Sequence, residues 1–219
     1  ILRIHQLTAL NQTRNILHER ALRELPGSYK LWHQYLLERR QQVRGKRLSD
    51  PAFEAVNNVF ERALVFMHKM PRIWLEYLQF LMAQKLITRC RHAFDRALRA
   101  LPITQHERIW TLYLQFIKQP FVPPETAVRV WRRYLKLEPN SAEDFVDYLV
   151  KADRLDEAAG ELAHIVNDDH YTSSTGKTRH QLWLQLCELI AHNLDRVHAL
   201  PVEQVIRQGI TKFVEMAGR

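Results

Sequence analysis

Large apolar side chains recur along the chain at the spacing of an α-helix. Trp74, Tyr77, Leu78 and Leu81 occupy positions i, i+3, i+4 and i+7 of one segment. Residues at these separations lie on one face of a helix, so the segment predicts a helix with one buried side. No segment alternates apolar and polar residues over a length that predicts a β-strand.

The segment that follows has two apolar faces. Its large face carries Phe94, Leu98 and Leu101, and its small face carries Ala93, Ala97 and Ala100. A helix of this kind packs between two neighbours, with close backbone approach on the alanine side. The two segments together predict a helical hairpin that stacks against other hairpins.

The aromatic pattern of the first helix is repeated. Its copies are Trp32-x-x-Tyr35-x-x-Glu38, Trp74-x-x-Tyr77-x-x-Phe80 and Trp110-x-x-Tyr113-x-x-Phe116, with weaker copies at Phe145-x-x-Tyr148 and Trp183-x-x-Leu186. Successive copies begin roughly 35 to 42 residues apart, which is the period of helical-hairpin repeats.

A second pattern alternates with the first. Its copies are Glu19-Arg20-Ala21-Leu22, Phe60-Glu61-Arg62-Ala63-Leu64, Phe94-Asp95-Arg96-Ala97-Leu98 and the divergent Trp131-Arg132-Arg133-Tyr134-Leu135. In three copies a proline closes the unit at the same offset, namely Pro26, Pro102 and Pro139. Two patterns that alternate in fixed order are more specific than either pattern alone.

Helix-boundary signals agree with this register. Asp50 followed by Pro51 predicts a helix start. Thr104 with Glu107, and Ser141 with Asp144, predict capping boxes. The prolines of residues 119–124 predict the turn of one hairpin, and residues 167–180 are expected to form a polar connection between hairpins.

The predicted fold is all-α, a solenoid of stacked helical hairpins. We expect residues 1–219 to form a single elongated domain with about five hairpins and partial hairpins at its ends. Because the chain begins with Ile1 and has no signal-peptide pattern, we also expect it to be a fragment of a longer chain.

The two alternating patterns resemble the HAT (half-a-tetratricopeptide) repeat, which is found almost exclusively in RNA-processing proteins. Within that class, four stretches resemble the N-terminal part of the Syf-one/XPA-binding family of splicing factors. These stretches are residues 28–32, 63–71, 94–106 and 154–159. The resemblance runs from about Thr13 to the end of the chain and weakens after Leu135. The stretch 66–71 departs from the general repeat, because its proline lies further from Ala63 than in the other copies.

The helical spacing of the repeat residues predicts that they form the core. The predicted core residues are Trp32, Tyr35, Ala63, Trp74, Tyr77, Phe94, Ala97, Trp110, Tyr113 and Trp183. The alternative for the tryptophans is base stacking on RNA, but their alignment with Tyr and Leu on one helix face favours burial.

Composition supports a helical protein and adds an asymmetry of charge. Only 6 of 219 residues are glycine, so few turns need a positive φ. The two cysteines, Cys90 and Cys187, lie far apart in helical segments, which favours a reducing compartment. Residues 1–100 hold 18 basic and 8 acidic side chains, a balance of +10, whereas residues 101–219 hold 14 and 16, a balance of −2. The basic half is suited to an acidic partner or RNA, although such charges often serve only to solvate helix faces.

No catalytic, cofactor or metal site can be assembled from the sequence. Gly176-Lys177-Thr178 resembles part of a phosphate-binding loop, but Tyr171 stands where that loop needs its first glycine. The histidines are scattered without the spacing of metal ligands. We therefore expect no enzyme activity, no cofactor and no bound metal.

Two basic clusters are the candidates for partner or RNA contacts. Arg39, Arg40, Arg44, Lys46 and Arg47 are expected in a long connection between the two helices of one hairpin. Arg89, His92, Arg96 and Arg99 form a stripe on one side of the next hairpin's second helix. Arg96 belongs to the repeat motif and is expected to pair within the solenoid, whereas Arg89 and Arg99 are expected to be freer.

The resemblance implies a non-catalytic nuclear scaffold in pre-mRNA splicing, with spliceosomal proteins such as components of a NineTeen-like complex as partners. It implies no membrane and no small-molecule substrate. Two alternatives stay open. One is a different HAT scaffold, of the crooked-neck-like or cleavage-stimulation type. The other is a helical module that binds RNA directly through the basic N-terminal half.

Overall fold

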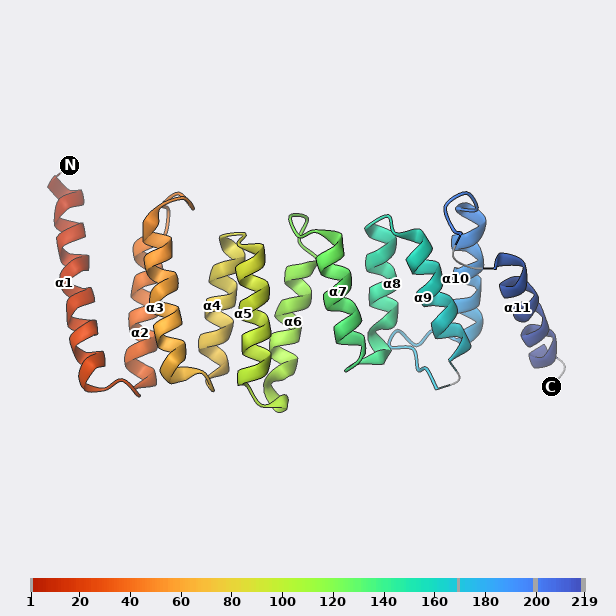
Figure 1. Cartoon of the computed structure of the whole chain (residues 1–219), viewed down its shortest axis with the longest axis horizontal. Coiled ribbons are helices and arrows are strands. Elements are labelled where there is room, and N and C mark those ends of the chain that lie inside the picture. The colour runs from red at the N-terminus through yellow and green to blue at the C-terminus, as the bar shows by residue number, and fades with distance from the viewer. Residues whose placement is uncertain (1, 169, 199–200, 218–219) are drawn as a thin grey trace. The chain divides into compact units, whose positions relative to one another are not determined.

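The computed structural model describes residues 2–168, 170–198 and 201–217, and in them the chain is helical and has no β-strand (Figure 1). The prediction of an all-α fold of helical hairpins is confirmed in the described residues. The first helices are α1 (Leu2–Glu24), α2 (Tyr29–Val43), α3 (Pro51–Met67), α4 (Pro71–Ala83), α5 (Ile87–Ala100) and α6 (His106–Ile117). They are followed by α7 (Pro124–Leu135), α8 (Ala142–Lys151), α9 (Leu155–Asn167), α10 (Arg179–His192) and α11 (Val202–Ala217). Short 3₁₀ helices, η1 (Ile103–Gln105) and η2 (Pro139–Ser141), precede α6 and α8.

The helices form two compact units, Ile1–Phe116 and Ile117–Arg219. Unit 1 contains α1 to α5 and all of α6 except its last residue, and unit 2 contains α7 to α11. That the two units form one elongated domain stays a prediction from the sequence.

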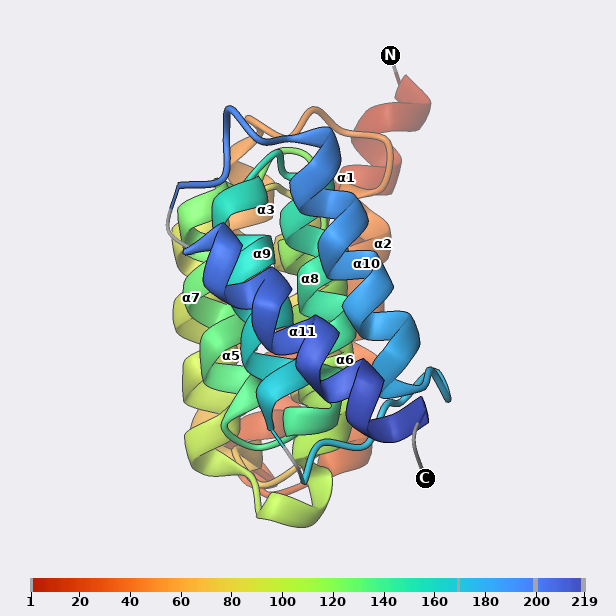
Figure 2. The same cartoon turned by 90° about the vertical axis from the view of Figure 1, so that its right-hand side faces the viewer.

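In unit 1 each helix packs against the next one in the chain, from α1 through α5. Figure 2 shows α3 and α5 on one side of this unit and α2 and α6 on the other. The turns from α1 to α2, from α3 to α4 and from α5 to α6 lie at the same end of the unit (Figure 1). This is the arrangement of stacked hairpins, in which each helix buries its apolar faces against its neighbours.

The tryptophan of the first pattern fixes the turn that precedes its helix. The indole N–H of Trp32 donates a hydrogen bond of 2.8 Å to the carbonyl of Pro26, and that of Trp74 donates one of 2.8 Å to the carbonyl of His68. Both acceptors lie six residues before their tryptophan. His68 thus occupies the position of the closing proline in the copy where Pro71 is displaced. Because Pro71 is the first residue of α4, the displaced proline starts the helix instead of ending the turn.

Stacked aromatic rings join consecutive helices of unit 1. Phe60 of α3 stacks on Tyr77 of α4 with ring centroids 5.0 Å apart, and Phe94 of α5 stacks on Tyr113 of α6 at 4.2 Å. All ten predicted core residues are buried in the structure: Trp32, Tyr35, Ala63, Trp74, Tyr77, Phe94, Ala97, Trp110, Tyr113 and Trp183. The repeat motif therefore supplies both the large rings and the small alanines of the core.

Unit 2 follows the same plan with substituted residues. Helices α8 and α9, α9 and α10, and α10 and α11 pack against each other. Trp131 of α7 takes the position that Phe60 and Phe94 hold in the clearer copies, and it lies 5.8 Å from Phe145 of α8. Figure 2 shows α7 and α9 on one side of this unit, α8 and α10 on the other, and α11 against α10.

The helix-boundary predictions are partly right. The Asp50 side chain accepts a hydrogen bond from the amide of Ala52 at the start of α3, as expected. Helix α6 ends at Ile117 and α7 begins at Pro124, so Pro120 and Pro123 lie in the turn and Pro124 is the first residue of α7. The polar connection is also present, because α9 ends at Asn167 and α10 begins at Arg179.

Two predicted capping boxes are wrong. Thr104 lies inside the 3₁₀ helix Ile103–Gln105, because the chain makes this short turn before α6 starts at His106. Ser141 precedes α8, but its side chain makes no capping hydrogen bond. The capping box of unit 2 is formed by Thr178 and Gln181 at the start of α10, a pair that the sequence pattern did not single out.

Candidate functional site

The acidic residue of the second pattern joins three helices of unit 1. The carboxylate of Glu19 in α1 accepts a hydrogen bond of 2.8 Å from the hydroxyl of Tyr35 in α2. It also accepts bonds of 2.9 and 2.5 Å from the two terminal nitrogens of Arg62 in α3. The Arg62 guanidinium lies 6.0 Å from the centre of the Trp32 ring, within the range of a cation–π contact.

The next repeat contains the same arrangement. Glu61 of α3 accepts a bond of 2.8 Å from Tyr77 of α4 and bonds of 3.0 and 2.8 Å from Arg96 of α5. The Arg96 guanidinium lies 5.5 Å from the centre of the Trp74 ring. The expectation that Arg96 pairs within the solenoid is therefore confirmed, and its partner comes from the preceding hairpin.

We call these two repeated sets the Glu–Arg–Tyr ladder: Glu19 with Tyr35 and Arg62, and Glu61 with Tyr77 and Arg96. In each set the carboxylate charge is paired with the charge of the arginine. Hydrogen bonds from Arg62, against the opposing effect of burial, hold the pKa of Glu19 below its usual value. Burial alone would raise the pKa of Glu61, but the bonds from Arg96 and Tyr77 outweigh it and lower the pKa. Burial and the adjacent carboxylates raise the pKa of Tyr35 and Tyr77. The partners of each carboxylate come from neighbouring helices, so these perturbed groups join the stacked helices of unit 1.

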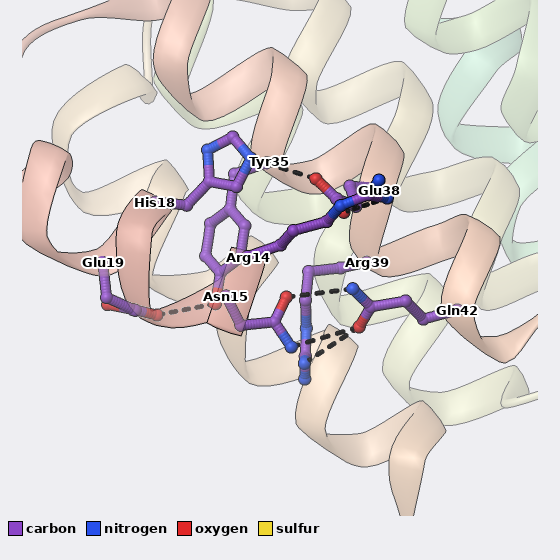
Figure 3. Close-up of polar contacts among 8 residues, drawn as sticks. All are labelled: Arg14, Asn15, His18, Glu19, Tyr35, Glu38, Arg39 and Gln42. Atoms are coloured by element: carbon purple, nitrogen blue, oxygen red, sulfur yellow. Dashed lines mark hydrogen bonds and ion pairs between the residues drawn. The ribbon is translucent and has the colours of Figure 1, made fainter. Parts of the chain in front are cut away.

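A second polar network lies between α1 and α2 (Figure 3). The side-chain amides of Asn15 and Gln42 exchange hydrogen bonds of 3.2 and 3.0 Å. Nearby, Glu38 pairs with Arg14 at 3.3 Å and with His18 at 3.1 Å. The sequence pattern did not predict this network, although its amide pair recurs one hairpin later. There, buried Asn57 and Gln84 exchange bonds of 3.0 and 3.1 Å.

The predicted basic cluster between α2 and α3 is only partly a loop. Arg39 and Arg40 belong to α2, which runs to Val43, so their predicted place in the connection is wrong. The amphipathic pattern of α2 simply continues further than the charge run suggested. Arg39 donates a bond of 3.3 Å to Gln42, and Arg40 lies 3.7 Å from Glu76 of α4.

The rest of that cluster lies in the exposed connection of residues 44–50. Lys46 lies 3.8 Å from Asp50. Arg44 and Arg47 are exposed, and no described side chain forms an ion pair with either. Of the five basic residues in this predicted cluster, Arg44 and Arg47 are therefore the two that are exposed and have no acidic partner among the described side chains.

The basic stripe on α5 also contains both a paired and an exposed arginine. Arg89 donates a bond of 2.7 Å to Glu54 of α3, so the expectation that Arg89 is freer is wrong. Its partner lies 35 residues earlier and comes alongside only through the stacking of the hairpins. Arg99 is exposed, and its Nε donates to the carbonyl of Asp95 on the same helix.

An open groove lies on unit 1 where α1 and α3 flank α2; we call it the α1–α3 groove. Its lining residues are Glu19, Leu22 and Arg23 of α1, Pro26 and Trp32, and Arg62, Val65 and Phe66 of α3. Its volume is about 560 Å³. Phe66 stacks on Trp32 with ring centroids 6.1 Å apart and is 50% exposed, and Val65 is 70% exposed. The available signal in the sequence was the pair of large apolar residues directly after Leu64, which the repeat pattern does not explain.

Unit 2 contains a buried carboxylate under the connection from α9 to α10. Glu143 of α8 is 4% exposed and accepts hydrogen bonds from Tyr171 and Thr175, and Lys177 lies 3.5 Å away. These contacts outweigh burial and lower the pKa of Glu143. Lys177, the lysine of the phosphate-loop resemblance, thus pairs with Glu143 and also donates to Gln185 at 3.2 Å. Its position serves the docking of the connection onto α8.

Two further features concern metal binding and membranes. In the described part of the chain, no group of three His, Cys, Asp or Glu side chains is placed to hold a metal ion. None of the helices in residues 2–168, 170–198 and 201–217 has both the length and the apolar character needed to cross a bilayer.

Comparison with protein families matches almost every residue of the chain. The family model described as "Pre-mRNA-splicing factor Syf1/CNRKL1 N-terminal HAT repeat" matches residues 2–140. The family model described as "Pre-mRNA-splicing factor SYF1 middle HAT repeat" matches residues 142–219.

Comparison with curated proteins agrees. The chain is 60% identical to the Drosophila melanogaster "Pre-mRNA-splicing factor syf1 homolog", over 98% of this chain and 24% of the fly protein. It is 57% identical to the human "Pre-mRNA-splicing factor SYF1", over 94% of this chain and 24% of the human protein. A more distant relative, "Pre-mRNA-splicing factor cwf3" of Schizosaccharomyces pombe, is 39% identical over 100% of this chain and 28% of its own length.

The chain spans about a quarter of the length of these relatives. The stacked hairpins of the structure are the architecture of helical repeats, and both matching family models describe HAT repeats. The chain belongs to the SYF1 family of HAT-repeat pre-mRNA-splicing factors.

Proposed function

We propose that this chain is a non-catalytic scaffold segment that acts in pre-mRNA splicing in the nucleus and holds spliceosomal proteins, such as NineTeen-like components, in register. Membership of the SYF1 family supports the process, because its curated members are named pre-mRNA-splicing factors. The crooked-neck-like and cleavage-stimulation alternatives have less support, since the second family match and the names of the curated relatives point to SYF1.

The observation that carries the proposal is the repeated ladder of unit 1. Glu19 with Arg62, and Glu61 with Arg96, tie each hairpin to the next one by paired hydrogen bonds. A stack held by both apolar rings and matched charges keeps its exposed faces at fixed spacing. A scaffold needs such fixed spacing, because partners that dock on different hairpins are then held in a defined order.

The placement of the perturbed groups supports a non-catalytic role. Catalytic acids and bases with shifted pKa values usually face a cleft that admits substrate. Here the carboxylates of Glu19 and Glu61 are occupied by arginine and tyrosine partners, and Glu143 is covered by a connection between helices. Their pKa shifts are explained by helix packing.

A depletion and add-back experiment tests the proposal. Nuclear extract is depleted of the full-length protein that contains this segment, and splicing of a reporter pre-mRNA is measured after add-back. The intact protein is expected to restore splicing, and a form without residues 1–219 of this sequence is expected to fail and to lose spliceosomal proteins on purification. Equal rescue by both forms would contradict the proposal, as would recovery of polyadenylation factors alone.

Direct RNA binding is a second candidate, favoured by the unmatched charges of Arg44 and Arg47. The test replaces Arg44, Lys46 and Arg47 of the full-length protein by Gln and measures affinity for single-stranded RNA against salt. If these cations contact phosphates, the affinity falls and its dependence on salt becomes weaker. A control with Arg129, Lys136 and Lys151 of unit 2 replaced by Gln removes the same charge and is expected to change neither. Unchanged binding in the first variant would dismiss this candidate.

A further inference from the structure

The α1–α3 groove exposes a pair of adjacent apolar residues, Val65 and Phe66, that the copies in α1, α5 and α7 do not have. Val65 and Phe66 follow the motif Glu61-Arg-Ala-Leu directly. At the position of Val65, the copy in α1 has Arg23, the copy in α5 has Arg99 and the divergent copy has Lys136. A cation at the end of the helix is thus the ordinary residue of this position. Val65 and Phe66 replace solvated surface by a large apolar pair that stays 70% and 50% exposed.

The shape of the groove suits an inserted side chain. Its volume of about 560 Å³ falls in the range of sites that enclose small groups. Phe66 stacks on Trp32, and Trp32 is fixed in turn by its bond to Pro26, so the aromatic wall is pre-organised. A pre-organised apolar wall beside buried residues, here Leu22 and Trp32, is typical of the pockets that receive anchor residues at protein interfaces.

The charge of the groove selects its occupant. Glu19 is already paired with Arg62 and Tyr35, so its negative charge is matched. Arg23, which lies on α1 four residues after Glu19, is exposed, and no described side chain forms an ion pair with it. Arg20 is exposed on the same face of α1, three residues earlier. The groove therefore offers an apolar wall bordered by unmatched positive charge.

We propose that the α1–α3 groove binds an acidic segment of a partner protein, with a large apolar side chain inserted beside Phe66 and Val65 and a carboxylate on Arg23. This proposal deepens the scaffold function and rests on it. A peptide is favoured over RNA because Leu22 and Val65 offer no hydrogen bonds to the edge of a base. A peptide can place one carboxylate at Arg23 and a large apolar side chain beside Val65, whereas a phosphate backbone has no apolar side chain to insert there.

The test uses the full-length protein and short overlapping peptides that tile the proteins that co-purify with it. Binding is compared for wild type, Val65→Asp and Arg23→Glu. Two matched controls are Ile103→Asp, an apolar residue of unit 1 that is 77% exposed outside the groove, and Arg99→Glu, the exposed counterpart of Arg23 in the copy on α5. Unchanged melting of all four variants shows that binding differences do not come from unfolding.

The expected result is a set of acidic peptides with one bulky apolar residue, whose affinity falls about tenfold or more in both groove variants and stays unchanged in both controls. Replacing that apolar residue by Ala in the peptide should have the same effect. The proposal is overturned if no peptide distinguishes the groove variants from the controls, or if single-stranded RNA is the ligand that the groove variants lose.

The reporter assay separates this proposal from the scaffold function. If splicing requires the segment but Val65→Asp binds every peptide like wild type, the groove proposal fails and the scaffold proposal stands. If the segment is dispensable for splicing, the scaffold proposal fails whatever the groove binds.

Discussion

The guanidinium of Arg62 donates two hydrogen bonds to the carboxylate of Glu19, 43 residues earlier in the chain. The equivalent pair one hairpin later is Arg96 with Glu61, separated by 35 residues. The separations differ because the connection from α2 to α3 is longer than that from α4 to α5 and the helical segments between the paired residues are also longer, yet the geometry is the same. The ladder therefore depends on the stacking of helices and is independent of loop length.

The first prediction concerns the second set of this ladder, in which Glu61 pairs with Arg96 and Tyr77. Glu61→Gln removes the charge that pairs with Arg96 and accepts from Tyr77, and leaves the shape of the side chain unchanged. We expect the free energy of unfolding to fall by about 1–2 kcal/mol, because Arg96 is partly exposed and recovers some solvation. Urea denaturation measures the change.

The matched control is Glu125→Gln, whose side chain pairs with Arg154 at 2.8 Å but is 71% exposed. An exposed pair contributes little, so we expect a change below about 0.5 kcal/mol. If the two variants lose stability equally, the Glu61–Arg96 pair does not stabilise the stacked helices more than an exposed ion pair does.

The second prediction is a loss of stability in acid. The pKa values of Glu19, Glu61 and Glu143 lie below their usual 4.5 in the folded chain. A carboxyl with a depressed pKa stabilises the fold fully above its unfolded value and loses that contribution as the pH falls through the folded value. The urea midpoint should therefore change little between about pH 5.5 and pH 8 and fall as the pH drops below about 4.5.

Glu61→Gln supplies the internal check on this pH dependence. The variant has no carboxyl at this position, so the stability gap between it and wild type should narrow as the pH falls below 4.5. A gap that stays constant down to the acid transition would show that protonation of Glu61 is not coupled to unfolding.

The third prediction concerns the tryptophan of the first pattern. Trp74 is buried, and its indole N–H is bonded to His68. Trp74→Ala should lower the free energy of unfolding by roughly 3–5 kcal/mol, because it leaves a large cavity and an unpaired carbonyl. A denaturation curve identical to that of wild type would place this side chain outside the core. Leu75→Ala, one position along on a half-buried site, serves as the control and should cost less.

The sequence predicts the helices and their buried faces well, because these follow from local periodicity. Trp74 and Ala97 could be assigned to the core from their spacing alone. The partners of charged residues could not be assigned in this way. Arg89 contacts Glu54 because α5 packs beside α3, and the spacing of residues along α5 does not predict that contact.

The groove illustrates the same limit. Leu64, Val65, Phe66 and Met67 form a continuous apolar run, in which Val65 and Phe66 are exposed and Met67 is buried, so apolar character alone does not separate core from groove. Val65 lines this groove together with Leu22 of α1 and Pro26 of the following turn, residues that lie about 40 positions earlier in the chain. Comparison of the repeat copies with one another was the available signal, since Arg23, Arg99 and Lys136 stand at the same position.

The last prediction concerns two helical glycines of unit 2 that should respond to the same substitution in opposite ways. A Cβ added to Gly209 of α11 would lie 2.8 Å from the ring of Trp183 in α10. Trp183 is buried, so its ring cannot swing into solvent, and Gly209→Ala must push α11 away from α10. We expect a loss of about 1–3 kcal/mol in spite of the better helix propensity of alanine.

A Cβ added to Gly160 of α9 would meet no atom within 4 Å, so Gly160→Ala gains helix propensity without a clash. We expect it to raise the free energy of unfolding by up to about 1 kcal/mol. Thermal melts of both variants measure the contrast directly. If Gly209→Ala also raised the melting temperature, the close contact between α10 and α11 through Trp183 would be wrong, because only that contact reverses the usual preference for alanine in a helix.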